Sequence, residues 1–142
     1  MKNNEEQAMA TTSDQQLVAA AIAASQQAYI PYSRYAVGAA LLASDGTVYT
    51  GCNVESASYS PTICAERTAL VKAISEGKRE FTAVAVATRD AGSPCGVCRQ
   101  LLYEFSPPMR VIMADMAGNI RVTTTLKALL PHGFGPANLQ VE

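Results

Sequence analysis

Three cysteines, carried by two separate stretches, have the spacing of a metal site. Cys64 lies in "SPTICAERTA", and Cys95 and Cys98 lie in "SPCGVCRQ". Side chains three residues apart share one face of a helix at a Cβ separation of about 5–6 Å, which suits a tetrahedral zinc ion. Taken alone, Cys-x-x-Cys also fits a redox pair or an ordinary helix. With Cys64 added, the pattern favours zinc held by three cysteines.

Two residues next to Cys64 could supply the rest of a catalytic site. Three protein ligands leave a fourth position for water, and zinc lowers the pKa of such a water to about 7. Glu66 could then move protons, and Arg67 could offset the net charge of −1 that three thiolates and one zinc ion carry. The alternative for "CAER" is the start of an amphipathic helix, with Glu66 and Arg67 on its solvated face.

The spacing of Cys64 and Glu66 restricts where the metal can lie. Positions two apart in an α-helix point about 200° apart, so both can face one ion only if it lies beyond the helix N-terminus. Pro61 precedes Cys64, and Ser93-Pro94 precedes Cys95, so both cysteines stand where a helix begins. We therefore expect two helix N-termini, with their positive partial charge, to face one ion and favour thiolates.

The elements that must hold this site alternate along the chain. Ser13 and Gln16 form a capping-box pattern, and Asp45-Gly46 marks a β-hairpin turn. Gly77 is expected to stop the second helix, and Ser93 to cap the third with Pro94 at its first position. The pattern predicts an α/β fold: a three-layer α-β-α arrangement around a mixed five-stranded sheet. The expected helices are 14–29, 62–77, 94–105 and 126–130, and the expected strands are 36–44, 48–55, 81–88, 110–115 and 120–125.

Composition narrows the class of protein. The chain has 142 residues, 49% of them apolar and 16% charged, with a net charge of −1. We expect one domain over 13–142 after a polar, flexible tail over 1–12. The balanced charge argues against a nucleic-acid partner, and no apolar run approaches the ~20 residues that cross a membrane. Without a signal-peptide pattern the expected compartment is the cytoplasm, where four cysteines suggest metal binding or catalysis over disulfides.

Five stretches together resemble the cytidine deaminase family, in its small, three-cysteine form. They are "CAE" (64–66), "PCGVC" (94–98), "PYSRYAVGAALL" (31–42), "GCNVESASY" (51–59) and "LLPHGFGPANL" (129–139). The resemblance implies one zinc ion per chain and a homotetramer with shared active sites. It also implies a proton-shuttling role for Glu66, which would protonate N3, help deliver hydroxide to C4 and protonate the departing ammonia.

The resemblance assigns further residues to the substrate. Asn53 and Glu55 would bind the ribose hydroxyls, and the backbone of Ala65 and Cys95 would contact the pyrimidine. Tyr35 would line the base pocket in a position where the family usually has phenylalanine. From other subunits, three residues would reach the substrate: Ala57, Tyr59 and Phe134. Two more departures are Ser56, where the family often has asparagine, and a slightly short "TRDAGSPCG" segment.

The sequence therefore predicts a zinc-dependent hydrolase that deaminates cytidine and 2'-deoxycytidine in pyrimidine salvage. Two alternatives stay open: a deaminase for a modified or antibiotic aminonucleoside of the blasticidin type, and a structural zinc module without activity. Without the resemblance, Asn53 and Glu55 are simply polar residues that leave a strand. We expect Cys52 to be a buried small residue and not a ligand, and His132 to lie on the surface.

Overall fold

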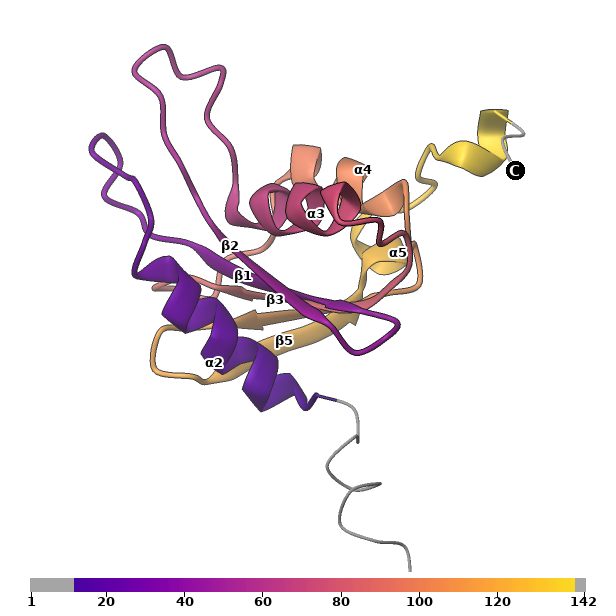
Figure 1. The fold of residues 1–142 in the computed structure, drawn as a ribbon, viewed down its shortest axis with the longest axis horizontal. Helices are drawn as coiled ribbons and strands as arrows, with labels where there is room; N and C mark the ends of the chain where they lie inside the picture. The colour runs from indigo at the N-terminus through magenta and orange to yellow at the C-terminus, as the bar shows by residue number, and fades with distance from the viewer. Residues whose placement is uncertain (1–11, 140–142) are drawn as a thin grey trace, which may run out of the picture.

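The computed structural model describes residues 12–139, and most of the predicted flexible tail lies outside this range. The order of elements is the predicted one, with a short 3-10 helix added near the C-terminus (Figure 1). The helices are α2 (Asp14–Ser25), α3 (Ala65–Ser75), α4 (Gly96–Tyr103), α5 (Leu126–Leu129) and the 3-10 helix η1 (Pro136–Leu139). The strands are β1 (Gly38–Ala43), β2 (Val48–Cys52), β3 (Phe81–Ala87), β4 (Arg110–Ala114) and β5 (Ile120–Thr125).

The strands form one mixed sheet, as predicted. Its order is β2-β1-β3-β4-β5. Only β3 and β4 run parallel, and the other neighbours are antiparallel. Because β3 and β4 are joined through α4, their carboxyl ends lie beside the N-terminus of that helix, where Cys95 stands.

Helices cover both faces of the sheet and give the predicted three layers. Helix α2 packs on one face through Leu17, Val18 and Ala21, which form a buried cluster with the small residues of β1 and β3. Helices α3, α4 and α5 lie on the opposite face (Figure 1), where Leu70 and Leu102 are fully buried. The two helices that carry the cysteines therefore share one face of the sheet.

Several predicted helix starts or ends are wrong by two residues or more. Helix α2 ends at Ser25 and not at Tyr29, because Tyr29 forms a β-bridge with Val54. Helix α3 begins at Ala65 and not at Thr62, because Ile63 forms a β-bridge with Val54. Helix α4 begins at Gly96 and not at Pro94, and its N-cap is Cys95 and not Ser93, because Cys95 takes an extended conformation and its sulfur accepts from the Cys98 N–H. The capping box of Ser13 and the hairpin at Asp45-Gly46 are confirmed.

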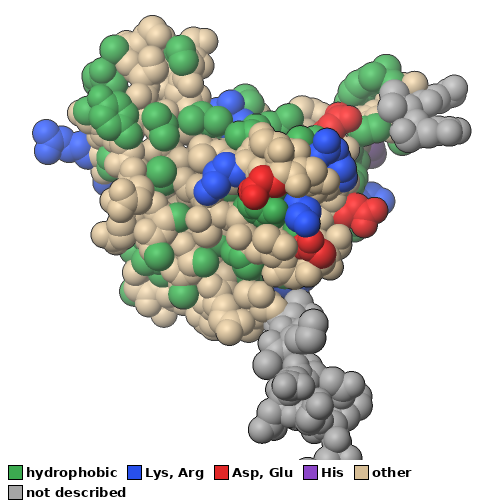
Figure 2. Space-filling view, viewed as in Figure 1, with side chains coloured by type: hydrophobic (Ala, Val, Ile, Leu, Met, Phe, Trp, Pro, Cys, Tyr) green, Lys and Arg blue, Asp and Glu red, His purple; other side chains and the backbone are tan. Residues whose placement is uncertain are grey.

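The segment between β2 and α3 projects from the body of the molecule beside the segment that follows α2 (Figure 1). Hydrophobic side chains gather on this projection and around η1 in the space-filling view (Figure 2). Tyr29, Tyr32 and Tyr59 are more than half exposed there, and the rings of Tyr32 and Tyr59 meet edge to face. Within residues 12–139, no helix is long and apolar enough to cross a membrane.

Candidate metal centre and active-site cavity

Cys64, Cys95 and Cys98 come together between the N-termini of α3 and α4, and we call them the cysteine cluster. Cys64 is the N-cap of α3 and Cys95 is the N-cap of α4. Both have extended backbone, so their side chains lie beyond the end of the helix. The expected arrangement of two helix N-termini around one point is therefore present.

The sulfur positions fit one tetrahedral zinc ion. The Sγ atoms of Cys64 and Cys95 are 3.8 Å apart, those of Cys95 and Cys98 are 3.4 Å apart, and all three lie within 4.8 Å of one another. Zinc–sulfur bonds of about 2.3 Å at tetrahedral angles separate sulfurs by about 3.8 Å. Cys98 is buried, Cys64 is half-buried and Cys95 is exposed, so the cluster opens to one side.

The surroundings of the cluster favour negative charge on sulfur. A hydrogen bond from the Cys98 thiol, with a further contribution from Arg67, lowers the pKa of Cys64 to about 5. The same bond to Cys64, together with burial, raises the pKa of Cys98. The Arg67 Nη2 atom lies 3.7 Å from Cys64 Sγ and donates to the Thr62 carbonyl at 3.2 Å. This is the contact that the charge-compensating role requires.

A cavity of about 440 Å³ opens in front of the cluster. The Glu66 side chain lines it and is only 3% exposed. Its Oε1 atom has no hydrogen-bond partner, the only such buried side-chain atom besides Arg67 Nε within residues 12–139. Burial raises the pKa of the Glu66 carboxyl. A buried carboxylate without a partner is costly for stability, so its place beside three metal-ligating sulfurs points to chemistry.

The same cavity is also lined by the two residues assigned to the ribose. Asn53 is buried, and its amide bridges the backbone by donating to the Tyr35 carbonyl at 2.7 Å and accepting from Val37 N–H at 3.0 Å. Glu55 Oε1 accepts from the backbone N–H groups of Tyr32 and Ser33. These bonds fix both side chains in the cavity wall before any ligand binds.

Tyr35, which the resemblance assigns to the base pocket, also lines the cavity. Its hydroxyl donates to the Asp90 carboxylate, and the Arg89 guanidinium lies 4.8 Å from the centre of its ring. Burial and the bond to Asp90 raise the pKa of the Tyr35 hydroxyl. The additional oxygen is therefore held by the segment that leads to Cys95.

The other substrate residues lie differently. Ala65 is fully buried behind the cluster at the start of α3, while Cys95 lines the cavity. Ala57 and Tyr59 are exposed on the projection, and Phe134 is 56% exposed near the C-terminus. None of these three lines the cavity of its own chain. Outside the site, Cys52 is half-buried and not part of the cluster, and His132 is exposed.

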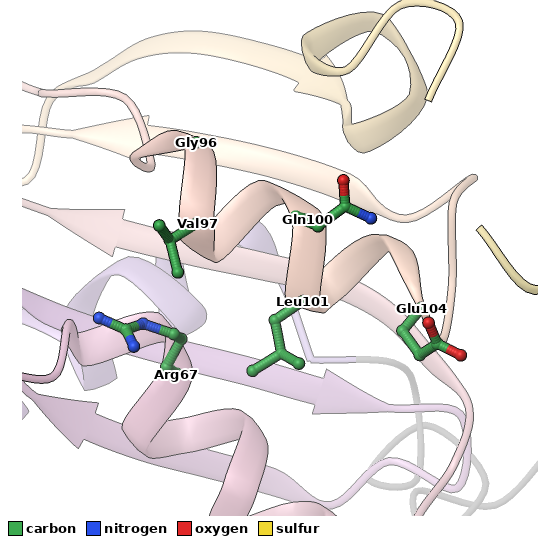
Figure 3. A pocket seen from close by; sticks show the side chains of 6 residues that line it. All are labelled: Arg67, Gly96, Val97, Gln100, Leu101 and Glu104. Carbon is green, nitrogen blue, oxygen red and sulfur yellow. The ribbon is translucent and has the colours of Figure 1, made fainter. Parts of the chain in front are cut away.

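A second hollow, of about 580 Å³, lies between α3 and α4 (Figure 3). Val97 and Leu101 project from α4 toward Arg67 of α3, and Glu104 lies at the far end of the hollow. It is larger than the cavity at the cluster, but neither the three cysteines nor Glu66 lines it. We therefore place the chemistry in the cavity that contains Glu66.

Comparison with known proteins now decides the family. Residues 11–115, well over half of the chain, match the model described as the cytidine and deoxycytidylate deaminase zinc-binding region. The chain belongs to this family of deaminases.

Individual relatives agree along most of the chain. A cytidine deaminase of Sporosarcina psychrophila is 51% identical, with 87% of this chain and 92% of that protein covered. One of Halalkalibacterium halodurans is 49% identical over 84% and 92% of the two chains. The crystal structure of a cytidine deaminase from Burkholderia pseudomallei superposes with a TM-score of 0.82 at 46% identity, covering 87% of this chain and all of that one.

Membership of the deaminase family makes the cysteine cluster a zinc site, one per chain, in agreement with the prediction.

The residues around it include two that the motifs alone did not single out. Arg99 donates to the Pro94 carbonyl at 2.8 Å, to Ser93 Oγ at 2.6 Å and to the Leu129 carbonyl at 3.0 Å. It thereby ties the segment before Cys95 to α5. The only sequence feature that could have pointed to Arg99 is its position directly after Cys98.

Gln100 makes the corresponding contact with the C-terminal segment. Its Nε2 atom donates to the Phe134 carbonyl at 2.8 Å. Successive residues of α4 thus bind the metal, brace the preceding loop and hold the segment that carries Phe134. No feature of the sequence reveals this last contact, because its partners are 34 residues apart.

Proposed function

We propose that the protein catalyses the hydrolytic deamination of cytidine and 2'-deoxycytidine to uridine and 2'-deoxyuridine, with release of ammonia. The observation that carries the proposal is the buried Glu66 carboxylate, whose Oε1 atom has no hydrogen-bond partner, in one cavity with the cysteine cluster. A structural zinc module would not keep a buried carboxylate without a partner at its metal. The family membership and the cytidine deaminase relatives support the same reaction.

The chemistry divides between the metal and Glu66. Zinc, held by Cys64, Cys95 and Cys98, supplies Lewis acidity that makes water a nucleophile near neutral pH. The Glu66 carboxylate takes a proton from the attacking water and gives it to N3 as the new C4–O bond forms. It then takes the remaining proton from the new C4 hydroxyl and passes it to the departing amino group, so that the C4–N bond breaks, C4 becomes a carbonyl, one water is consumed and one ammonia is released. The raised pKa of Glu66 suits a group that both accepts and donates protons in the reaction.

We assign the part of the cavity that Asn53 and Glu55 line to the sugar. The Glu55 oxygen that is not held by Tyr32 and Ser33 would accept from a ribose hydroxyl, and Asn53 would offer its remaining amide hydrogen. Backbone groups of Ala65 and Cys95 would contact the pyrimidine, with Tyr35 beside it. A sugar pocket of this kind favours a plain nucleoside over an antibiotic of the blasticidin type.

The deciding experiment is an ultraviolet assay on cytidine, 2'-deoxycytidine and blasticidin S, combined with zinc analysis. We expect turnover of the first two and about one zinc per chain. Glu66→Gln should keep zinc and lose at least about 100-fold in kcat, since it removes a group used in more than one proton transfer. Turnover of blasticidin S alone would support the antibiotic deaminase. Bound zinc without turnover of any of the three compounds would support a structural zinc module without activity.

We also propose a homotetramer whose subunits complete one another's active sites. Ala57, Tyr59 and Phe134 lie away from their own cavity, and Phe134 is exposed between two glycines. A neighbouring subunit would place the Phe134 ring over the base, and stacking of this kind contributes about 1–3 kcal/mol. Phe134→Ala should therefore weaken cytidine binding by about tenfold or more while zinc stays bound.

Mixed subunits test this arrangement. Glu66→Gln and Phe134→Ala proteins, dissociated together and reassembled, would contain some sites with both residues intact. Activity should then exceed the average of the two proteins assayed apart. If subunit exchange is confirmed and activity stays at that average, Phe134 does not act across a boundary.

Two broader assignments complete the proposal. We infer that residues 13–142 form one domain, supported by the single sheet that α2 covers on one face and α3, α4 and α5 cover on the other. We infer a cytoplasmic location, where reducing conditions keep the three zinc-binding thiols from forming disulfides. The net charge of −1 supports a free nucleoside, and not a polynucleotide, as the substrate.

A further inference from the structure

The turn over residues 88–92 joins the end of β3 to the segment that leads into Cys95. Thr88 is buried at the carboxyl end of β3, and its N–H donates to the Ala114 carbonyl of β4 at 3.1 Å. Its hydroxyl oxygen accepts from the Gly92 N–H at 2.6 Å and so closes the turn. Thr88 and Gly92 both line the active-site cavity, so the turn forms part of its wall.

Asp90 ties this turn to Tyr35, which lines the same cavity. Its Oδ1 atom accepts from the Thr88 hydroxyl at 3.1 Å and also from the Tyr35 hydroxyl. Tyr35 precedes β1, 55 residues earlier in the chain. The Arg89 guanidinium adds a second contact, 4.8 Å from the centre of the Tyr35 ring. One carboxylate oxygen thus joins two walls of the same cavity.

The turn needs such a tie because its backbone is strained. Ala91 has a φ of 55°, in the left-handed region that is unfavourable for a residue with a side chain. Strained residues of this kind persist where surrounding contacts over-determine them. Gly92 also lies close to the tie, since an added Cβ would be 3.1 Å from the Tyr35 hydroxyl. The turn is therefore seated directly against Tyr35.

We propose that Asp90 is a positioning residue for the deaminase reaction: through its bond to Tyr35 it latches the 88–92 turn against the cavity wall. The latch sets the width of the cavity at the segment that carries Ser93 and Cys95. Neither Asp90 nor the Tyr35 hydroxyl needs to touch the substrate for this role. The proposal rests on the proposed function, because the substrate whose binding it tunes is cytidine.

The test is a double-mutant cycle with Tyr35→Phe, Asp90→Ala and the double variant. A typical hydrogen bond makes a net difference of about threefold to tenfold in an equilibrium constant. We expect each single variant to raise KM for cytidine by about that factor, with kcat within about twofold and zinc content unchanged. The KM of the double variant should not exceed the higher KM of the two single variants. Once Asp90 is absent, the Tyr35 hydroxyl has no hydrogen bond to the turn, so its removal has no further effect.

A second measurement needs no substrate. Amide hydrogen exchange of residues 88–92 should become faster by about threefold to tenfold in both single variants, most clearly at Gly92. If the parent does not turn over cytidine, the proposed function fails, and this measurement alone still decides whether the latch exists.

Asp45 provides a matched control. It is also an exposed aspartate of a turn, it accepts from the Thr47 N–H and from the Lys78 ammonium, and it lies in the β1–β2 hairpin. Asp45→Ala should leave KM and the exchange of residues 88–92 unchanged.

Three results would overturn the proposal. Losses that multiply in the double variant would mean that Tyr35 and Asp90 act separately. A raised KM for Tyr35→Phe with an unchanged KM for Asp90→Ala would mean that the hydroxyl contacts the substrate itself. Unchanged amide exchange at Gly92 in both variants would mean that the turn is held without the latch.

Discussion

A single added methyl group on β2 should disturb the metal site, although it lies in the core. Gly51 packs against the first turn of α3, the helix that Cys64 caps and that carries Glu66. A Cβ at this position would lie 2.6 Å from both the Ala65 carbonyl oxygen and the Ala69 nitrogen. The shortest ordinary contact is about 0.8 Å longer, and both atoms are backbone, so the helix itself must move.

The expected cost follows from that displacement. Overpacking of a core costs about 1–3 kcal/mol, which for a chain of this length lowers Tm by about 3–12 °C. A misplacement approaching 1 Å at reacting groups can cost about 100-fold in rate. We therefore expect Gly51→Ala to lose kcat by more than its fall in stability suggests, and to bind zinc more weakly.

The assay compares zinc content, Tm and cytidine turnover for Gly51→Ala and Gly96→Ala. Gly96 follows Cys95 directly, yet an added Cβ there meets no atom within 4 Å. The Gly96 variant should therefore keep its zinc and its activity. If Gly51→Ala matches the parent in all three measurements, close packing of β2 on α3 does not set the position of Cys64.

Three further predictions concern single side chains. Cys98→Ser should lower zinc content from about one per chain, whereas Cys52→Ser should not, and full zinc retention by the first variant would remove Cys98 from the ligand set. Arg67→Gln should retain zinc but bind it with altered affinity and turn over cytidine more slowly; parental values for both would end the charge argument. Backbone and side-chain bonds from Asn119, with Arg121, lower the pKa of Asp115 from 3.8 to about 2. Since this folded-state pKa is depressed, its stabilisation is present above about pH 4 and is lost as pH falls toward 2, so urea midpoints of Asp115→Asn should fall less steeply than the parent's over that window.

Local sequence signals predicted much of the site. The spacing of Cys95 and Cys98, the helix-start residues before Cys64, and the carboxylate of Glu66 each reflect chemistry within a few residues of chain. Because residues two apart in a helix point in nearly opposite directions, the spacing of Cys64 and Glu66 predicts a metal beyond the helix N-terminus. The structure has this arrangement, with Cys64 as the N-cap of α3. The apolar runs along the sequence were sufficient to predict the five strands, because each strand buries one or both of its faces and therefore carries a recognisable pattern of apolar residues.

Long-range contacts were beyond the reach of the same reasoning. Helix α2 ends early because Tyr29 exchanges backbone hydrogen bonds with Asn53 and Glu55. No residue near Tyr29 in the sequence indicates these contacts. The phenolic oxygen of Tyr35 needed a partner, but only the structure identifies it as Asp90. In both cases the decisive partner is a loop residue whose position depends on the completed sheet.

The cysteine cluster shows how a three-thiolate site can remain reactive in this fold. Three thiolates with one zinc ion carry a net charge of −1, which weakens the metal as a Lewis acid. The fold opposes that charge from three directions: Cys64 and Cys95 each cap a helix, and Arg67 lies 3.7 Å from Cys64 Sγ. The side chain of Cys64 makes no capping hydrogen bond, so the first N–H groups of α3 stay available to the cluster. Because each helix N-terminus carries roughly half a positive charge, the two helices together offset about as much charge as the arginine does. Substitution of Arg67 alone should therefore weaken the site without abolishing it.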